Sequence, residues 1–215
     1  MVQTRGDIPH GDCRSGGRKM SPEKVNNGKF SWKYWARVLL GSGILLLPVS
    51  ACVQGGKVMI AEPKVVPYVE LERYLGTWYE IARYPQRFQE GCVASKAVYE
   101  LGRDGKIQVY NECRQGSLEG AVKSVRGKAK VVDPVTNAKL KVTFFWPFYG
   151  DYWIIDLGEN YEYAVVGHPT RKYLWVLSRT PEMEESVYRG ILDRLEKQGY
   201  DTGRLMRTPQ PGGKN

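Results

Sequence analysis

Histidine is scarce in this chain of 215 residues, which has only two. One of them, His168, stands in the turn-like segment His168-Pro169-Thr170. A nucleophilic triad needs a general base, and a zinc site needs clustered histidine or cysteine ligands, so neither kind of site is predicted. Glu80 is the one acid that we expect to find buried, in a hydrogen-bonded structural role rather than a catalytic one. The sequence thus predicts a protein that is not an enzyme and uses no metal or cofactor.

Long hydrophobic runs are also absent, because the apolar segment Val38–Leu47 is too short to span a bilayer as a helix. Lys29, Lys33 and Arg37 precede it, a pattern typical of a secretory signal. The following Val49-Ser50-Ala51-Cys52 resembles the lipobox of bacterial lipoproteins, in which the cysteine takes a lipid. We predict that residues 1–51 form a cleaved lipoprotein signal segment and that Cys52 is lipidated. The alternative is an ordinary secretory signal followed by an unmodified cysteine.

Basic charge is concentrated in this predicted signal, whose eight Lys or Arg and three acids supply +5 of the formal net charge of +9. Without a basic cluster or a known motif after Cys52, nucleic-acid binding is not predicted. Residues 52–69 are expected to form a tether, 70–210 the folded domain and 211–215 a tail. Val53 after the lipidated cysteine favours the outer membrane, by analogy with enterobacterial lipoproteins, with the domain in the periplasm. Translation starts at either Met1 or Met20.

Two cysteines, Cys92 and Cys113, fall in the predicted folded domain, where export permits a disulfide. They flank two strand-like runs joined by Gly102–Gly105, which is a hairpin turn signal. Pairing the residues on either side of this turn would place Cys113 opposite Ala94, two residues from Cys92. A bridge worth roughly 3 kcal/mol in the chain-entropy model is predicted, and two buried free thiols are the alternative.

Short runs rich in Val, Ile, Tyr and Phe recur from residue 76 onward and are separated by turn signals. This spacing is typical of an antiparallel barrel or sandwich. Eight strands are predicted, over residues 77–83, 93–101, 106–113, 119–131, 138–145, 152–157, 161–167 and 172–179.

The period changes after the eighth run. Met183, Val187, Ile191 and Leu195 recur every four residues, which predicts a helix with one apolar stripe. Thr180 is the expected N-cap, with Pro181 at the first helical position, and Gly199 is expected to end the helix.

Three segments, in order, carry a resemblance to a known family. Gly76-Thr77-Trp78, Asp156–Tyr163 and Ser178–Pro181 resemble the three signature regions of the lipocalins. The resemblance runs from about Tyr74 to Gln210 and narrows to the bacterial lipocalins. The segments Lys139–Val142, Pro147–Tyr152 and Tyr173–Trp175 carry that narrower resemblance. It implies an all-β fold, an eight-stranded antiparallel up-and-down β-barrel with a C-terminal α-helix packed on the outside.

The resemblance also implies how one end of the barrel is closed. Trp78, introduced by Gly76, would plug that end, and the guanidinium of Arg179 would lie across the indole. These roles are structural. The second region departs from the family, since Gly158-Glu159-Asn160-Tyr161 replaces its Thr-Asp-Tyr, which leaves the local turn geometry open.

For function, the resemblance implies binding of a small apolar molecule, a fatty acid or a lysophospholipid. With Arg179 as the marker of strand phase, the inward-facing set is mostly apolar or aromatic with a few polar groups, as expected for an acyl chain with one polar end. Alternatively, these residues fill the barrel as core. The predicted ligand-binding residues are Tyr99, Val109, Asn111, Val125, Val142, Phe144, Tyr152, Ile154, Ala164, Val166, Tyr173 and Trp175.

The lip of the barrel is expected from Pro85–Glu90, where Arg87 could meet a headgroup, and from Trp146–Tyr149, whose aromatics could rest on membrane or on a second subunit. The predicted function is therefore lipid transport, storage or envelope maintenance by a membrane-anchored lipocalin, with homodimerisation left open. One alternative is a lipid-anchored envelope interaction protein with a vestigial cavity. A lipocalin-like enzyme is the less favoured one.

Overall fold

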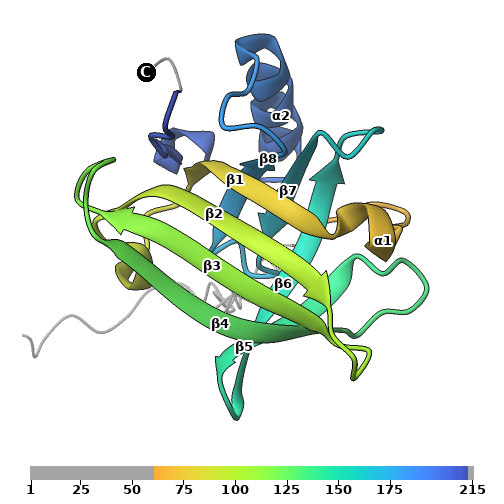
Figure 1. The fold of residues 1–215 in the computed structure, drawn as a ribbon. Helices are drawn as coiled ribbons and strands as arrows, with labels where there is room; N and C mark the ends of the chain where they lie inside the picture. The colour runs from red at the N-terminus through yellow and green to blue at the C-terminus, as the bar shows by residue number, and fades with distance from the viewer. Residues whose placement is uncertain (1–60, 213–215) are drawn as a thin grey trace, which may run out of the picture. The chain divides into compact units, whose positions relative to one another are not determined.

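The structure, a computed structural model, describes residues 61–212, so the predicted signal segment and Cys52 lie outside the described residues. Eight antiparallel strands close into an up-and-down barrel because β1 pairs with β2 on one side and with β8 on the other (Figure 1). This confirms the predicted fold. The strands are β1 (Gly76–Arg83), β2 (Cys92–Leu101), β3 (Ile107–Gln115), β4 (Val122–Val131), β5 (Lys139–Phe145), β6 (Phe148–Leu157), β7 (Tyr163–Gly167) and β8 (Leu174–Ser178).

Short elements complete the barrel. The helix α1 (Leu71–Tyr74) leads into β1, and the 3₁₀ turn η1 (Arg87–Gln89) lies between β1 and β2. After the main helix α2 (Glu185–Lys197), the turn η2 (Thr202–Arg204) leads to the two-residue strand β9 (Met206–Arg207), which pairs with β1. No helix within residues 61–212 is both long and apolar enough to cross a bilayer.

The helix α2 packs on the outer face of the barrel, next to β7, β8 and β1 (Figure 1). Alternation in β8 directs Leu174 and Val176 outward, and both are fully buried in a cluster with Ile191 and Leu195 of the helix. A second core lies inside the barrel, so each strand on this side is buried on both faces.

The start of α2 corrects the sequence prediction, because the helix begins at Glu185 and Thr180 does not cap it. The Thr180 hydroxyl instead donates to the carbonyl of Glu182, and the Thr180 N–H donates to the Ser178 hydroxyl. These local bonds hold the chain in a turn after β8. The predicted end is right, since Gly199 has a φ of +78° directly after the helix.

The apolar stripe of α2 is also partly different. Tyr188, Ile191 and Leu195 are its buried residues, whereas Val187 is 37% exposed. Met183 lies before the helix and packs on the same cluster from the preceding loop. Tyr188 therefore takes the place predicted for Val187 on the side of the helix that covers the barrel.

Residues 66–69 fall within the segment predicted as a tether, but the structure bonds them to the barrel. Val69 is fully buried, and its N–H donates to the carbonyl of Thr136 over 2.8 Å. The N–H of Val66 donates to the carbonyl of Ile154 over 3.0 Å. Residues 66–69 therefore belong to the barrel, because their backbone bonds are made to its strands and loops.

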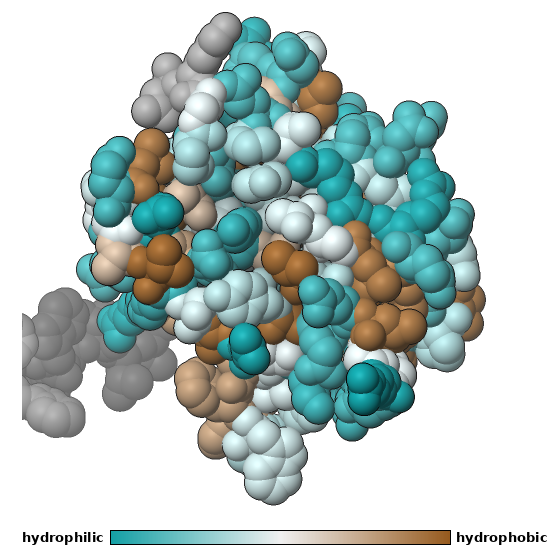
Figure 2. Space-filling view, viewed as in Figure 1, coloured by the Kyte–Doolittle hydropathy of each residue, from teal (hydrophilic) through white to brown (hydrophobic). Residues whose placement is uncertain are grey.

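Much of the surface on the side shown in Figure 2 is hydrophilic. Hydrophobic residues gather there next to α1 and the β2–β3 hairpin. Leu71, Leu75 and Leu101 lie close together between these elements, and Leu101 is exposed.

Candidate ligand-binding cavity

Trp78 closes one end of the barrel. Its side chain is fully buried, and its indole N–H donates to the carbonyl of Tyr74 over 2.8 Å. The guanidinium carbon of Arg179 lies 3.8 Å from the centre of the Trp78 rings. The same guanidinium donates to the backbone carbonyls of Leu75 and Thr77, at 2.9 and 3.0 Å. The Trp78 indole, covered by the hydrogen-bonded guanidinium of Arg179, thus closes this end of the barrel.

Gly76 and Tyr161 have unusual backbone conformations next to the Trp78–Arg179 pair. Gly76 has a φ of +91°, a conformation that side-chain-bearing residues rarely adopt. Tyr161, in the turn where the sequence departs from the family pattern, also has a positive φ of 62°. It contributes a carbonyl that accepts from Arg179 Nε at 3.2 Å. The altered turn therefore still supports the arginine.

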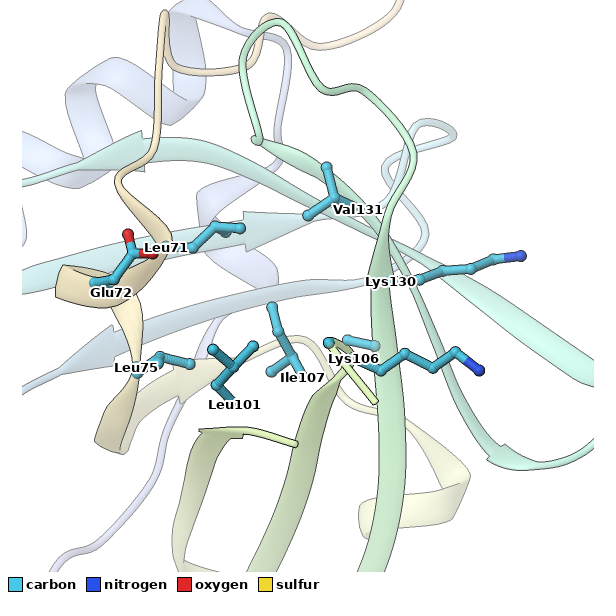
Figure 3. Close-up of a pocket in the computed structure, with 10 residues that line it drawn as sticks. Leu71, Glu72, Leu75, Leu101, Lys106, Ile107, Lys130 and Val131 are labelled. Carbon is cyan, nitrogen blue, oxygen red and sulfur yellow. The ribbon is translucent and has the colours of Figure 1, made fainter. Parts of the chain in front are cut away.

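A small hollow of about 300 Å³ lies outside the closed end (Figure 3). Leu71 of α1 and Leu75, directly after that helix, face Leu101 and Ile107 of the β2–β3 hairpin across it. It is about a third as large as the cavity inside the barrel. The inner cavity is therefore the stronger candidate for a ligand site.

The inner cavity measures about 880 Å³ and opens at the end opposite Trp78, where Phe88 of η1, Phe148 at the start of β6 and His168 after β7 line it. Ten of the twelve residues predicted from strand phase line it. They are Tyr99, Val109, Asn111, Val125, Val142, Phe144, Tyr152, Val166, Tyr173 and Trp175.

The other two predicted residues, Ile154 and Ala164, do not line the cavity. Both are fully buried in the core inside the barrel. Alternation gave their face correctly, but they lie in the packed core rather than on the cavity wall.

Several lining residues were missed. Ala97 and Leu177 lie on the same faces as Tyr99 and Trp175, two residues away, so alternation could have found them. Ser95 lies beyond a β-bulge, and Phe88 and Gln89 belong to η1, so strand phase gave no signal for these three.

Three tyrosines meet between the closed end and the cavity. The phenol oxygen of Tyr152 lies 2.8 Å from that of Tyr74 and 2.9 Å from that of Tyr99. Burial raises the pKa of all three, to about 12 for Tyr99. Each phenol therefore keeps its proton at neutral pH.

Two further polar atoms of the wall have no hydrogen-bond partner within residues 61–212. They are Asn111 Oδ1 and Ser95 Oγ, both buried. Asn111 pairs with Ala97 across the β2–β3 ladder, one inward-facing step from the pair formed by Tyr99 and Val109. The cavity is therefore apolar with a few polar points on the β2–β3 side.

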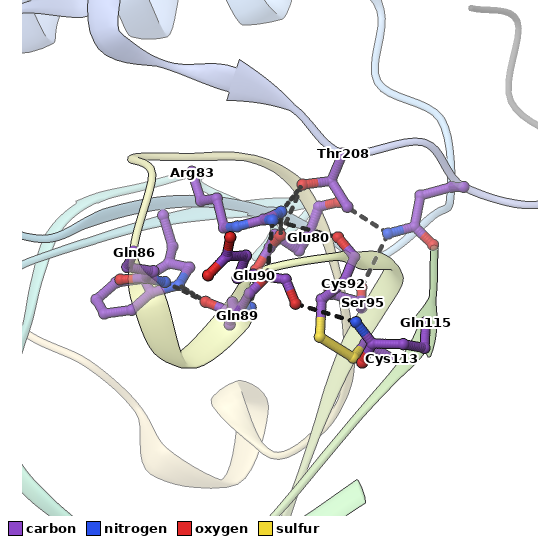
Figure 4. Close-up of a disulfide and its surroundings, with 12 residues drawn as sticks. Glu80, Arg83, Gln86, Gln89, Glu90, Cys92, Ser95, Cys113, Gln115 and Thr208 are labelled. Carbon is purple, nitrogen blue, oxygen red and sulfur yellow. Dashed lines mark hydrogen bonds and ion pairs between the residues drawn. A yellow bond between two sulfur atoms is a disulfide. The ribbon is translucent and has the colours of Figure 1, made fainter. Parts of the chain in front are cut away.

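Glu80 forms a buried ion pair beside the cavity (Figure 4). Its Oε1 accepts from Arg83 Nη1 at 2.8 Å and from the Thr208 hydroxyl at 2.6 Å, and its Oε2 accepts from Gln89 Nε2 at 2.8 Å. Both carboxylate oxygens are thus occupied. This arrangement ties β1 to η1 and to the C-terminal segment, as expected for a structural acid.

The predicted disulfide is confirmed, with Cys92 and Cys113 joined beside this network (Figure 4). The predicted pairing was wrong by one residue, because Leu101 pairs with Ile107 and the turn is longer. A bulge follows Val93, with Ala94 at a φ of 48°. The bulge shifts the register so that Cys92 and Cys113 come within reach, with their Cα atoms 5.5 Å apart.

The β5–β6 hairpin carries exposed aromatics at the mouth. Phe145, Trp146 and Phe148 are 75%, 82% and 77% exposed. The β4–β5 ladder runs only from Val131↔Leu140 to Lys128↔Thr143, and the hairpin continues beyond it, away from β4 (Figure 1). Arg87, the predicted headgroup contact, is exposed and does not line the cavity.

His168 also lies at the mouth. Its Nδ1 is 2.9 Å from the Thr170 hydroxyl, and its Nε2 is 3.7 Å from Asp151 Oδ2. Burial lowers its pKa, so the ring is neutral at neutral pH. Within residues 61–212, no group of three or more His, Cys, Asp or Glu side chains is placed to bind a metal ion.

Comparisons with known proteins agree with this architecture. A family profile described as "Lipocalin-like domain" matches residues 69–210. The chain is 41% identical to temperature-induced lipocalin-1 of Arabidopsis thaliana, over 69% of this chain and 83% of that protein. It is 38% identical to the outer membrane lipoprotein Blc of Escherichia coli, over 78% of this chain and 98% of that protein.

Among solved structures, insecticyanin from the tobacco hornworm Manduca sexta matches with a TM-score of 0.55 at 20% identity. That match covers 69% of this chain and 83% of insecticyanin. The cockroach allergen Per a 4 matches with a TM-score of 0.54 at 18% identity, over 70% of this chain and 96% of the allergen. These likenesses show the shared barrel. With the profile match over the whole barrel and close relatives covered almost end to end, the chain belongs to the lipocalin family.

Proposed function

We propose that the barrel binds one long-chain monoacyl lipid, a fatty acid or a lysophospholipid, with its acyl chain inside the cavity. The observation that carries this proposal is the cavity of about 880 Å³, whose walls are largely apolar and aromatic and which lies on the open side of the barrel from the fully buried Trp78. That volume falls within the range of small-molecule sites.

Affinity would come from burial of the chain. Each methylene group that leaves water contributes about 0.8 kcal/mol, or about a fourfold change in Kd. The charged headgroup would stay at the mouth, where Lys123 is exposed and also lines the cavity. A charged group kept at the rim avoids the cost of burial in the apolar interior.

The relatives and the N-terminal sequence together support a proposal for the setting of this activity. Proteins of Escherichia coli and Citrobacter freundii at 38% and 39% identity are named outer membrane lipoproteins. The lipobox-like segment before Cys52 supports the same placement for this chain. We place it on the outer membrane through a lipid at Cys52, with its barrel in the periplasm, where it transports or stores lipid or maintains the envelope.

A chain-length series tests the carrier function. Purified protein, stripped of copurified lipid, is titrated with saturated fatty acids of increasing length in competition with a fluorescent fatty acid. We expect about fourfold tighter binding per methylene until the chain fills the cavity. Intrinsic tryptophan emission should change, because Trp175 lines the cavity. Unchanged emission together with an unchanged melting temperature would contradict the proposal.

Blocking the cavity provides the matched test. Val125 is on the cavity wall but partly exposed, so Val125→Trp can place a large ring across the cavity without overpacking the core. We expect at least tenfold weaker binding in a competition titration. The control is Val135→Trp, at an exposed position outside the cavity, which should bind as the unmodified protein does.

Exposed aromatics at the mouth favour a second candidate, assembly of the barrel with another copy through Phe145, Trp146 and Phe148. Native mass spectrometry separates the two. Copurified monoacyl lipid supports the carrier, whereas a stable lipid-free dimer supports an interaction protein with an unused cavity.

A further inference from the structure

The three phenols at the inner end of the cavity have more O–H groups than hydrogen bonds among them. Tyr74, Tyr99 and Tyr152 carry three O–H groups but make two oxygen-to-oxygen contacts, of 2.8 and 2.9 Å. Each contact uses one proton. One O–H proton is therefore left without a partner inside the cluster.

The position of the three side chains decides where that proton points. Tyr99 and Tyr152 line the cavity, whereas Tyr74 lies outside the lining, next to Trp78. The phenol of Tyr74 bonds to Tyr152, and leaving its proton unpaired in the core would be costly. Tyr74 therefore donates to Tyr152, and the remaining proton belongs to Tyr99 or Tyr152. Either residue offers it to the cavity.

The chemistry of this donor limits what can accept from it. The phenols are buried, with Tyr74 and Tyr99 only 3% and 6% exposed, and their surroundings are apolar side chains such as Val109 and Val166. An ion is expensive to bury at such a place, whereas a hydroxyl, carbonyl or ether oxygen is not, provided that it gains a hydrogen bond. A neutral oxygen is therefore the fitting partner.

Asn111 provides a second polar point nearby. It lies two residues along β3 from Val109, so about 7 Å along the same face of the strand. Its buried Oδ1 lacks a partner within residues 61–212 and can accept from a ligand hydroxyl. Polar groups thus mark the inner half of the cavity as well as its mouth.

We propose that the cavity accepts long-chain lipids that carry a neutral oxygen, such as a terminal hydroxyl or carbonyl, at the end of the chain that reaches the tyrosines. This inference rests on the proposed function, because it assumes an acyl chain that enters with its charged head at the mouth. It adds that the inner end of the site can hydrogen-bond a polar group, and so binds it without the penalty that a wholly apolar site would impose.

Two acids of equal size test whether the inner end accepts a terminal hydroxyl. In omega-hydroxypalmitic acid a terminal hydroxyl replaces the terminal methyl of heptadecanoic acid, with the same number of heavy atoms. Without a hydrogen-bond partner, the hydroxyl should weaken binding by about a hundredfold. With the free phenol proton as its partner, we expect the two Kd values in the unmodified protein to agree within about tenfold.

The phenols are then removed in a graded series. Tyr99→Phe leaves Tyr74 donating to Tyr152, whose own proton still reaches the cavity, so the ratio of the two Kd values should stay as in the unmodified protein. Tyr99→Phe with Tyr152→Phe removes both lining phenols. For this double variant we expect the Kd of the hydroxy acid, relative to that of heptadecanoic acid, to rise at least tenfold. Thermal unfolding of each variant checks that it is folded.

The outcomes are distinct. If the unmodified protein binds heptadecanoic acid but disfavours the hydroxy acid by more than about tenfold, the proposed hydrogen bond to the ligand is wrong and the carrier function stands. The same conclusion follows if the double variant loses affinity equally for both acids. If neither acid binds the unmodified protein, the proposed function itself fails. Should the double variant not fold, the comparison of the two acids in the unmodified protein still decides.

Discussion

The two ends of the barrel use the same kinds of side chain in opposite ways. At the closed end, Trp78, Tyr74 and Tyr161 are buried, and arginine guanidinium groups lie over Trp78 and Tyr161 at 3.8 and 4.1 Å from the ring centres. At the open end, Trp146 and Phe148 are exposed. The comparison teaches that an aromatic side chain stabilises this barrel where its faces and polar edge have partners. At the open end, where the aromatic side chains lack such partners, they stay exposed and can contact other molecules.

Replacing a tryptophan by alanine at each end should give the largest difference in the free energy of unfolding. Trp78→Ala removes a fully buried indole and its hydrogen bond to Tyr74, so the free energy of unfolding should fall by about 3–5 kcal/mol. Trp146→Ala, at the exposed tip of the β5–β6 hairpin, should change it by less than about 0.5 kcal/mol. Urea denaturation measures both. Equal losses would show that the two ends do not differ in this way.

The disulfide is one feature near the open end that we expect to stabilise the fold. It closes a loop with a sequence separation of 21 residues near the mouth, so Cys92→Ser with Cys113→Ser should lower the free energy of unfolding by roughly 3 kcal/mol. Reductant should destabilise the unmodified protein similarly and leave the double variant unaffected. An unchanged urea midpoint after reduction would show that the disulfide does not contribute to the free energy of unfolding.

The arginine over Trp78 tests whether the closed end serves stability alone. Arg179→Ala should cost about 1–2 kcal/mol of unfolding free energy, because a partly desolvated cation leaves the indole face. Fatty-acid affinity should stay within about twofold, since Arg179 does not line the cavity. Arg87→Ala, at the exposed lip, is the control that should change neither. Parallel losses in stability and affinity for Arg179→Ala would contradict this division of roles.

Alkaline pH should act on the tyrosines of the closed end. Burial raises the pKa of Tyr99 to about 12, whereas an unfolded tyrosine ionises near pH 10. Its contribution to stability is therefore complete below about pH 10 and is lost as the pH rises towards 12, by about 1.4 kcal/mol per pH unit.

Urea denaturation at roughly pH 9 and pH 11 measures this loss, with absorbance of the phenolate as a second signal. Tyr99→Phe should show a shallower decline than the unmodified protein. Identical slopes would mean that Tyr99 does not keep its proton in the folded state.

Much of the barrel could be predicted from the sequence because strand alternation is local. The period of two residues placed Tyr99, Val109 and Trp175 on the inner face, where the structure has them lining the cavity. The eight runs gave the strands and left a barrel or a sandwich open, and the family resemblance pointed to the barrel. The signal for Trp78 and Arg179 came from the family resemblance, and the structure places them in contact.

Register and depth could not be predicted in the same way. The β2–β3 pairing depended on the length of the turn and on the bulge at Ala94, which has a φ of 48°. Thr180 has the chemistry of an N-cap, but its hydroxyl bonds to Glu182 instead. Ile154 has the right face for the cavity and lies in the packed core. Each of these outcomes depends on which partner the folded chain brings near.

The sequence by itself determined the strands, the faces of their alternating side chains and the presence of a last helix with one apolar side, because these follow from periodicity along the chain. Only the tertiary structure decided how deep each inward side chain lies, which carbonyls hold Val66 and Val69, and that three phenols share two hydrogen bonds beside the cavity. Those features arise between residues far apart in the chain, and pairing over such distances is set by how the barrel closes.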